Sequence, residues 1–233
     1  DISIIEKFED LMDIHASGGD CFLGGEDFTE ILLQLIQAQL PEDLRADHRL
    51  PTLAESAKKH LTTESEWRHE FQSESSTQSL RLTRAEFESG SKGLLERMMK
   101  PIERAMRDAR MKPSDLDHIV LAGGATRMPF IKKMLSTYFL KFPLASLDPD
   151  TVVAQGAAIA AGMEAQDVHL RDRVMTDVCP FTLGVEVSNG TQRGIFSPII
   201  ERNQKVPTSR IEIYHAAHPD QKSVTLSIYQ GES

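Results

Sequence analysis

Ile119-Val-Leu-Ala-Gly-Gly-Ala-Thr-Arg-Met-Pro129 is the stretch that decides the fold of this 233-residue chain. Its first four residues are apolar and predict a short strand buried on both faces. Thr126, after the two glycines, is a candidate helix N-cap. Apolar residues with helical spacing follow it at Met128, Ile131, Met134, Leu135 and Tyr138. The stretch therefore predicts a strand, a two-glycine turn and a helix.

The two glycines of this turn, Gly123 and Gly124, have two interpretations. Because they carry no Cβ atom, a planar or charged ligand could approach the backbone closely, and the following helix would offer free N–H groups. The turn could equally be an ordinary connection that needs one left-handed residue. A lone glycine pair does not decide between these two interpretations.

The overall composition excludes several classes of protein. Lys+Arg 26 against Asp+Glu 35 gives a net charge of -9, which argues against a sequence-independent nucleic-acid binder. No apolar run approaches the length of a membrane span. Cys21 and Cys179 are far apart and form no CxxC motif, and no HExxH pattern indicates catalytic zinc. We therefore expect a cytoplasmic protein, in a reducing compartment, without nucleic-acid or membrane partners.

The first segments of the chain predict a hairpin and a helix. Alternating apolar residues predict strands at 2–8 and 12–16, joined by the short link Glu9-Asp10. The helix that follows ends before Pro41. Its apolar positions are Phe28, Leu32, Leu35 and Ile36. Because the alternation begins directly at Asp1, with no cap or loop before it, we expect a fragment cut inside a sheet.

A polar stripe runs along the helix expected at 50–61. It consists of Glu55, Lys58, Lys59 and Thr62, at spacings of 0, +3, +4 and +7, which places all four on one helical face. The stripe could be a solvated face with ion pairs between successive turns. It could also be a polar wall beside a bound ligand.

The middle of the chain predicts a second hairpin and a long helix. Weak alternation over 66–83 indicates two partly exposed strands joined by the serine-rich turn Ser73–Ser76. Thr83-Arg-Ala-Glu86 is a capping box, and the helix behind it should be kinked at Pro101. Its methionines have helical spacing, which favours a core face over a binding surface.

Asp148-Pro-Asp150 precedes the last expected helix, 151–163. Asp148 is the expected N-cap, and Pro149 the first helical residue. The helix is rich in alanine and glycine, so we expect its backbone to lie close against a sheet. Asp150 then lies near the helix start, towards the glycine turn, and two helix starts around one cleft would suit a nucleotide.

At Glu164 the composition changes. Residues 164–176 are polar and predict a linker. The segments beyond it all have strand patterns and are separated by turn residues, which predicts an all-β unit. These segments are 181–187, 195–200, 209–215 and 224–229.

Four ordered motifs resemble the seventy-kilodalton heat-shock chaperones, the DnaK-type ATPases. They are the runs 19–28, 119–129, 148–158 and 177–186. The HscC-type bacterial branch is most similar in sequence to the last of these runs and to residues 196–203 and 229–232. The resemblance implies an α/β fold that is the second lobe of an actin-like ATPase domain, followed by the first strands of an all-β peptide-binding sandwich. The implied boundaries are 1–163 for nucleotide-binding lobe II (subdomains IIA and IIB), 164–177 for the interdomain linker and 178–233 for the sandwich.

The resemblance also implies an adenosine site. It favours the ligand-binding interpretation of both the glycine pair and the polar stripe. The implied residues are Glu55, Lys58, Lys59, Thr62, Gly123, Gly124, Ala125, Arg127, Met128 and Asp150. Three of them depart from the usual family pattern. Lys59 replaces an arginine that stacks on adenine, Ala125 replaces a serine, and Thr62 replaces a serine but keeps its hydroxyl.

In the β unit, the resemblance implies a peptide channel with an arch over the bound peptide. The channel residues are Val185, Tyr214, Val224 and Leu226, and the arch residues are Ser188 and Ala217. Ser188 replaces the usual apolar arch residue. The linker carries arginines at 171 and 173 where the family often has an acidic residue followed by a leucine run, so the resemblance alone does not establish its docking on the ATPase domain.

The implied cofactors are ATP or ADP, with Mg²⁺ in the full-length protein. The family's phosphate loops, catalytic lysine and carboxylates precede the position of Asp1, which itself matches an aspartate beside the phosphate and cation site. The resemblance therefore assigns no catalytic or metal-binding residue within the chain, and we expect the chain alone to be inactive as an ATPase. The implied partners are unfolded or extended peptide segments, a J-domain co-chaperone and a nucleotide exchange factor.

Two alternatives from other classes stay open. A small-molecule kinase of the actin-like fold would share the strand, glycine turn and helix, but not the run 177–186. A chaperone-like interaction module with an inactive nucleotide site would be consistent with Lys59 and Ala125.

Overall fold

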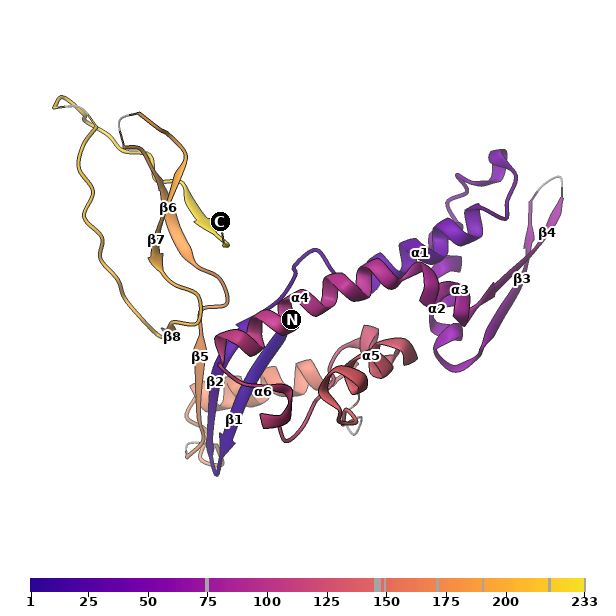
Figure 1. Cartoon of the computed structure of the whole chain (residues 1–233), viewed down its shortest axis with the longest axis horizontal. Coiled ribbons are helices and arrows are strands. Elements are labelled where there is room, and N and C mark those ends of the chain that lie inside the picture. The colour runs from indigo at the N-terminus through magenta and orange to yellow at the C-terminus, as the bar shows by residue number, and fades with distance from the viewer. Residues whose placement is uncertain are drawn as a thin grey trace. The chain divides into compact units, whose positions relative to one another are not determined.

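The computed structural model describes residues 1–73, 76–144, 148, 150–170, 172–189, 191–217 and 219–232. The chain forms two units, which we describe separately. The first comprises Asp1–Gly19, Pro101–Met111 and Ala161–Ser233, and the second comprises Asp20–Lys100 and Lys112–Ala160. Two helices, α4 (Lys92–Asp108) and α6 (Val152–Glu164), contribute to both units (Figure 1). Among the described residues, no helix combines the length and apolar character needed to cross a membrane.

The second unit is mainly helical. Its first two long helices, α1 (Gly25–Gln37) and α2 (Leu50–Thr63), pack on each other and confirm the helices expected there. A short 3-10 turn, Glu42–Leu44, lies between them. The buried faces follow the apolar spacing of the sequence and consist of Phe28, Leu32, Ile36, Leu50, Ala54, Ala57 and Leu61.

The expected hairpin in this unit is also confirmed. β3 (Glu66–Gln72) and β4 (Thr77–Thr83) pair antiparallel throughout, from Glu66 opposite Thr83 to Gln72 opposite Thr77. Thr83 caps α3 (Arg84–Gly90): the Glu86 amide donates to the Thr83 hydroxyl, and the Thr83 amide donates to the Glu86 carboxylate. The long helix is divided at Ser91 into α3 and α4, and α4 continues through Pro101.

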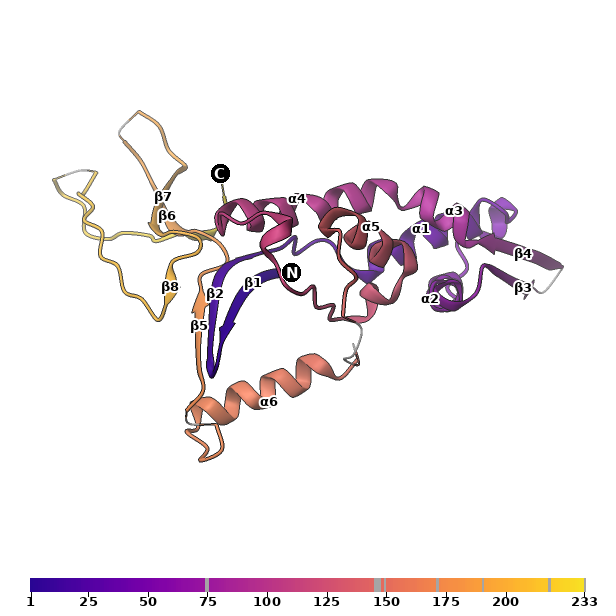
Figure 2. The same ribbon diagram turned by 60° about the horizontal axis from the view of Figure 1, so that its bottom comes forward.

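Three phenylalanines hold the helices of the second unit together. Phe28 of α1, Phe87 of α3 and Phe130 of α5 (Pro129–Phe139) are each at most 3% exposed. The ring centroids of Phe87 and Phe130 are 5.1 Å apart, and Phe28 lies 6.0 Å from Phe130 and 6.4 Å from Phe87. Edge-to-face contact of this kind adds to the stabilisation from burying the rings. The start of α5 is therefore fixed against α1 (Figure 2).

The connection before α5 differs from its prediction. Residues 119–122 form no strand: Val120 makes one isolated parallel bridge with Leu144 and is 58% exposed. A buried strand needs a paired neighbour on both sides, and the described residues provide only this single bridge. Thr126 is not the N-cap of α5; it lies in the 3-10 turn Gly124–Arg127, and Met128 is the residue before the helix. A shorter 3-10 turn, Pro113–Asp115, lies upstream.

The helix α6 begins at Val152, and the carbonyl of Asp148 accepts the amides of Thr151 and Val152. The Asp148 carboxylate also accepts the Asp150 amide, which agrees with a capping role. Pro149, the expected first helical residue, lies outside the described residues. No residue of α6 is buried, so the expected close packing of its small residues against a sheet is not formed.

The first unit contains two sheets. β1 (Ile2–Phe8) and β2 (Leu11–Gly18) pair antiparallel around Glu9, as expected. β2 then pairs in parallel with β5 (Val174–Val178), and β5 pairs with the two-residue strand β8 (Lys205–Val206), giving the order β1-β2-β5-β8. The second sheet has the order β7-β6-β9, from β6 (Leu183–Val187), β7 (Ile195–Ile200) and β9 (Ile228–Gln230).

Of the strands expected in the β segment, one is wrong and one was predicted too long. Residues 209–215 form no strand, and the strand expected at 224–229 is reduced to β9. Ile211 and Ile213 are 89% and 80% exposed. An alternating pattern makes a strand only where a neighbour accepts its hydrogen bonds, and the described residues offer 209–215 none.

The phenylalanine cluster generates a stability prediction. Phe28→Ala should lower the free energy of unfolding of the second unit by about 3–5 kcal/mol, because it removes a buried ring and leaves a cavity. Trp67, the only tryptophan, is 5% exposed in this unit, so its fluorescence during urea unfolding reports on this unit. Phe22→Ala is the matched control, since Phe22 is 79% exposed. Equal midpoints for the two variants would contradict the assigned core.

Candidate functional site

The polar stripe of α2 is organised around Lys58. Its ammonium lies 2.5 Å from the Glu55 carboxylate and donates to the carbonyl of Gly25 at 2.9 Å and to the hydroxyl of Thr29 at 2.8 Å. Thr29 in turn donates to Glu55 at 2.8 Å. All three donors of the ammonium therefore have partners on α1 or α2, and they fix the direction of the Glu55 carboxylate.

Glu55 is held in its ionised form by this arrangement. Partial burial opposes ionisation, but the hydrogen bonds from Lys58 and Thr29 outweigh it and lower the pKa of the Glu55 carboxyl. The result is a fixed acceptor on the surface of α2, suited to a hydroxyl or an amino donor of a ligand.

The other two stripe residues differ in their freedom. The Lys59 side chain is 76% exposed, and its ammonium lies 3.5 Å from the second oxygen of Glu55. The Thr62 hydroxyl donates to the Lys58 carbonyl at 3.0 Å, within the helix. Lys59 is therefore the stripe residue with most room to reach a ligand.

The glycine turn forms a second group, immediately before α5. Gly123 has φ +88, a conformation that favours glycine, and its carbonyl accepts the Thr126 hydroxyl at 2.7 Å. A Cβ atom built at Gly123 or Gly124 would meet no atom within 4 Å, so the backbone there borders open space. Ala125 is half-buried, and the Met128 side chain is 2% exposed in the core, so Met128 could contact a ligand only through its backbone.

Arg127 joins this turn to the segment before α6. Its guanidinium lies 2.6 Å from the Asp150 carboxylate and 3.1 Å from that of Asp148. This places Asp150 beside the turn, as expected from the sequence. The role of Asp148 in holding Arg127 was missed, because the sequence pattern indicated only a helix cap.

Packing of α1 links the two groups. Thr29, which binds the α2 stripe, follows Phe28, which packs on Phe130 at the beginning of α5. The glycine turn directly precedes α5. One helix thus positions both groups. The sequence indicated only that Gly25 could lie close to a ligand or a neighbouring helix, and the contact of Lys58 with Gly25 shows that the neighbour is α2; Thr29 was not identified from the sequence.

Two of the residues expected to bind peptide, Val185 and Tyr214, are connected through Ser197, which is opposite Val185 in the sheet. Val185 is 8% exposed on β6, and Tyr214 is bonded to Ser197 of β7 at 3.0 Å. The other four are exposed and lie outside the named strands; they are Ser188, Ala217, Val224 and Leu226. The assignment of these residues to a peptide channel stays a prediction.

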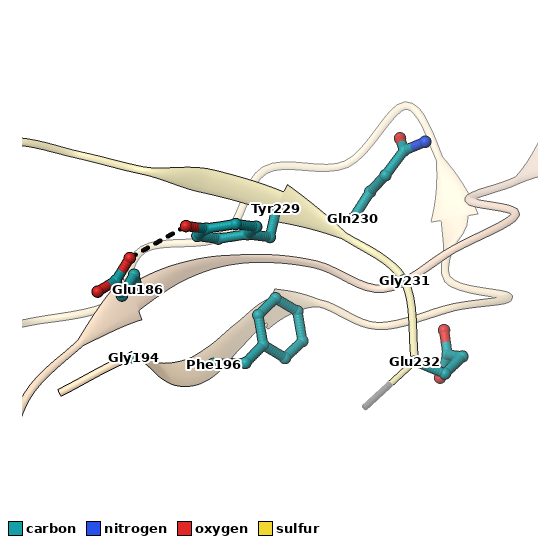
Figure 3. Close-up of a pocket in the computed structure, with 7 residues that line it drawn as sticks. All are labelled: Glu186, Gly194, Phe196, Tyr229, Gln230, Gly231 and Glu232. Carbon is teal, nitrogen blue, oxygen red and sulfur yellow. Dashed lines mark hydrogen bonds between the residues drawn. The ribbon is translucent and has the colours of Figure 1, made fainter. Parts of the chain in front are cut away.

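A cavity of about 350 Å³ lies elsewhere on the same sheet (Figure 3). Glu186 and Phe196 line it together with Tyr229, whose hydroxyl donates to Glu186 at 3.0 Å. The register pairs Glu186 with Phe196 and Gly184 with Tyr229, so this face is opposite the one that carries Val185. The cavity is therefore separate from the expected peptide channel.

The geometry of the stripe and the turn generates a binding prediction for the intact protein. Lys59→Arg should tighten ADP by a few-fold to about twentyfold, because a planar guanidinium gains stacking and cation–π attraction of roughly 0.5–2 kcal/mol on the nucleobase. Isothermal titration calorimetry measures the change.

Gly124→Val is the matching negative variant. Its side chain would enter open space rather than the protein, so it should abolish ADP binding while the fold is retained. If Lys59→Arg weakens ADP and Gly124→Val leaves it unchanged, the nucleoside does not lie between α2 and the turn.

The sequence of the chain also matches a known protein family. The family model described as Hsp70 protein matches residues 1–233, which include the α2 stripe, the glycine turn and the β segment. A match over the full 233 residues assigns the chain as a whole, rather than one motif. The chain belongs to the Hsp70 family.

Proposed function

We propose that this chain is part of an ATP-dependent molecular chaperone that couples ATP binding and hydrolysis to the binding of unfolded or extended peptide segments. The Hsp70 family is a family of nucleotide-binding chaperones whose full-length members are ATPases, which supports this proposal. In it, residues 1–163 are lobe II of the nucleotide-binding domain, 164–177 the linker and 178–233 the beginning of the peptide-binding sandwich, closest to the HscC-type branch.

The observation that carries the proposal is the attachment of β5. This strand lies at the end of the proposed linker and pairs in parallel with β2, with Leu11–Asp13 opposite Val174–Thr176. A second attachment joins Arg202, just before β8, to Asp108 of α4 at 3.0 Å, with both side chains 19% exposed. Two sites can influence each other only through elements that respond to both, and the proposal gives this role to β5.

The residues present fit an adenosine moiety. Glu55 supplies a fixed acceptor, Lys59 an exposed cation with an apolar stem, and Gly123 and Gly124 an open backbone surface. When bound, ATP with Mg²⁺ supplies the phosphoryl group for hydrolysis. By the family resemblance, Asp1 would lie beside the phosphate and cation; in the structure its carboxylate lies against Gly19, where a Cβ atom would collide with it.

The proposal includes a cytoplasmic location and two kinds of protein partner, a J-domain co-chaperone and a nucleotide exchange factor. It also includes inactivity of the 233-residue chain alone, since the phosphate-binding loops of the family lie before the position of Asp1.

The direct test is peptide release from the intact protein. A fluorescent extended peptide should dissociate faster with ATP than with ADP, because ATP binding would change the state of the linker and the sandwich. Equal dissociation rates with both nucleotides would indicate an interaction module with an inactive nucleotide site. No peptide binding, together with phosphorylation of a small hydroxylated substrate, would indicate the kinase alternative.

The small arch residues generate a second prediction. Ser188→Met should slow peptide dissociation, because a longer apolar side chain would close a low arch formed by Ser188 and Ala217. Stopped-flow fluorescence measures the rate. Gln192→Met is a suitable control, since Gln192 is exposed in the same connection and is not assigned to the arch. An unchanged rate for Ser188→Met would contradict the arch assignment.

A further inference from the structure

The connecting strand β5 buries little apolar surface where it pairs with β2; Val178, which is 3% exposed, lies beyond that ladder and pairs with β8. The ladder of β5 with β2 covers three residue pairs, and Val174 and Met175 are 52% and 44% exposed. A short ladder with exposed side chains gains little from the hydrophobic effect. Side-chain contacts at its end therefore decide whether the strand stays docked.

One carboxylate makes those contacts. Asp13, on β2, accepts a hydrogen bond from the hydroxyl of Thr176 on β5 and two from the ammonium of Lys205 on β8, at 2.8 and 2.9 Å. Asp13 and Thr176 are directly opposite in the parallel register, while Lys205 is opposite Val178 in the next pair of strands. A single side chain thus bridges three neighbouring strands.

The hydrogen bonds to Asp13 favour the ionised form of its carboxyl group. The Asp13 side chain is 21% exposed against 60% for Lys205, so the pair is only partly screened by solvent. The hydrogen bonds from Lys205 and then Thr176 hold the pKa of the Asp13 carboxyl below its usual value. The contact therefore stays ionic near neutral pH.

We propose that Asp13 is the positioning residue that holds β5 and β8 on β2, so that docking of the linker in this protein is electrostatic and weakens with salt. The assignment of β5 to a coupling linker rests on the proposed function, but the docking itself does not. Arg202 and Asp108 attach the same segment at a second place, so loss of Asp13 should loosen β5 rather than detach the whole β unit.

The test is amide hydrogen exchange of Val174–Val178 in the 233-residue chain, without nucleotide or peptide. Asp13→Asn and Lys205→Gln should each speed exchange by about two- to fivefold, the range expected for losing one partly exposed ion pair. The double variant should be no faster than either single variant, because both remove the same contact. Asp13→Glu, which keeps the charge, should restore much of the protection.

Salt dependence separates positioning from general stability. Raising NaCl from 0.05 to 1 M should speed exchange of these amides in the wild type and have no such effect in the double variant. Glu6→Gln is the matched control: Glu6 is opposite Asp13 on β1 and binds His15 at 2.9 Å. It should leave β5 protection unchanged.

Three outcomes would overturn the proposal. The first is that the amides of Val174–Val178 stay as protected in Asp13→Asn as in the wild type. The second is that salt still speeds their exchange in the double variant. The third is that Glu6→Gln speeds their exchange as much as Asp13→Asn does. If Asp13→Asn disturbs the hairpin, seen as lost protection at the buried Ile4 and Ile14, Lys205→Gln decides alone because it leaves β1 and β2 intact. Failure here would leave ATP-dependent peptide release unaffected as a separate test of the proposed function.

Discussion

The contact between Phe28 and Phe130 is the constraint on which the second unit depends. It brings α1 and α5 together, with Phe87 of α3 completing the cluster. The consequence for the site is direct, because Thr29 follows Phe28 and the glycine turn precedes α5. A shift of this contact would move the turn relative to the α2 stripe, and the proposed nucleoside site requires both.

The sequence predicts those parts of the fold that local patterns determine. Apolar spacing was sufficient for α2, and alternation was sufficient for both hairpins. The capping box at Thr83 was also correct because its partners are three residues apart. The strands predicted at 119–122 and 209–215 were wrong, because a strand depends on neighbouring strands, which periodicity in the sequence does not reveal.

The site could be predicted only in part. Helical spacing placed the four stripe residues on one face, and family resemblance indicated what that face could bind. The ion pairs of Glu55 with Lys58 and Lys59 agree with the spacing of the stripe, but the partners of Lys58 on α1 were not predicted. Lys58 and Thr29 are 29 positions apart, and Asp13 and Lys205 are 192 apart. Polar contacts across such separations leave no periodic pattern, so only the structure shows that Lys58 is fully bonded and Lys59 is not.

The central claim is that the α2 stripe and the glycine turn are two walls of one nucleoside site. Photoaffinity labelling of the intact protein with an azido-adenine nucleotide, followed by peptide mapping, tests it most directly. The account predicts labelled peptides from both 50–63 and 123–129, with labelling at both suppressed by unmodified ADP. The claim is contradicted if the labelling that ADP suppresses is confined to one of these segments or is found only outside both.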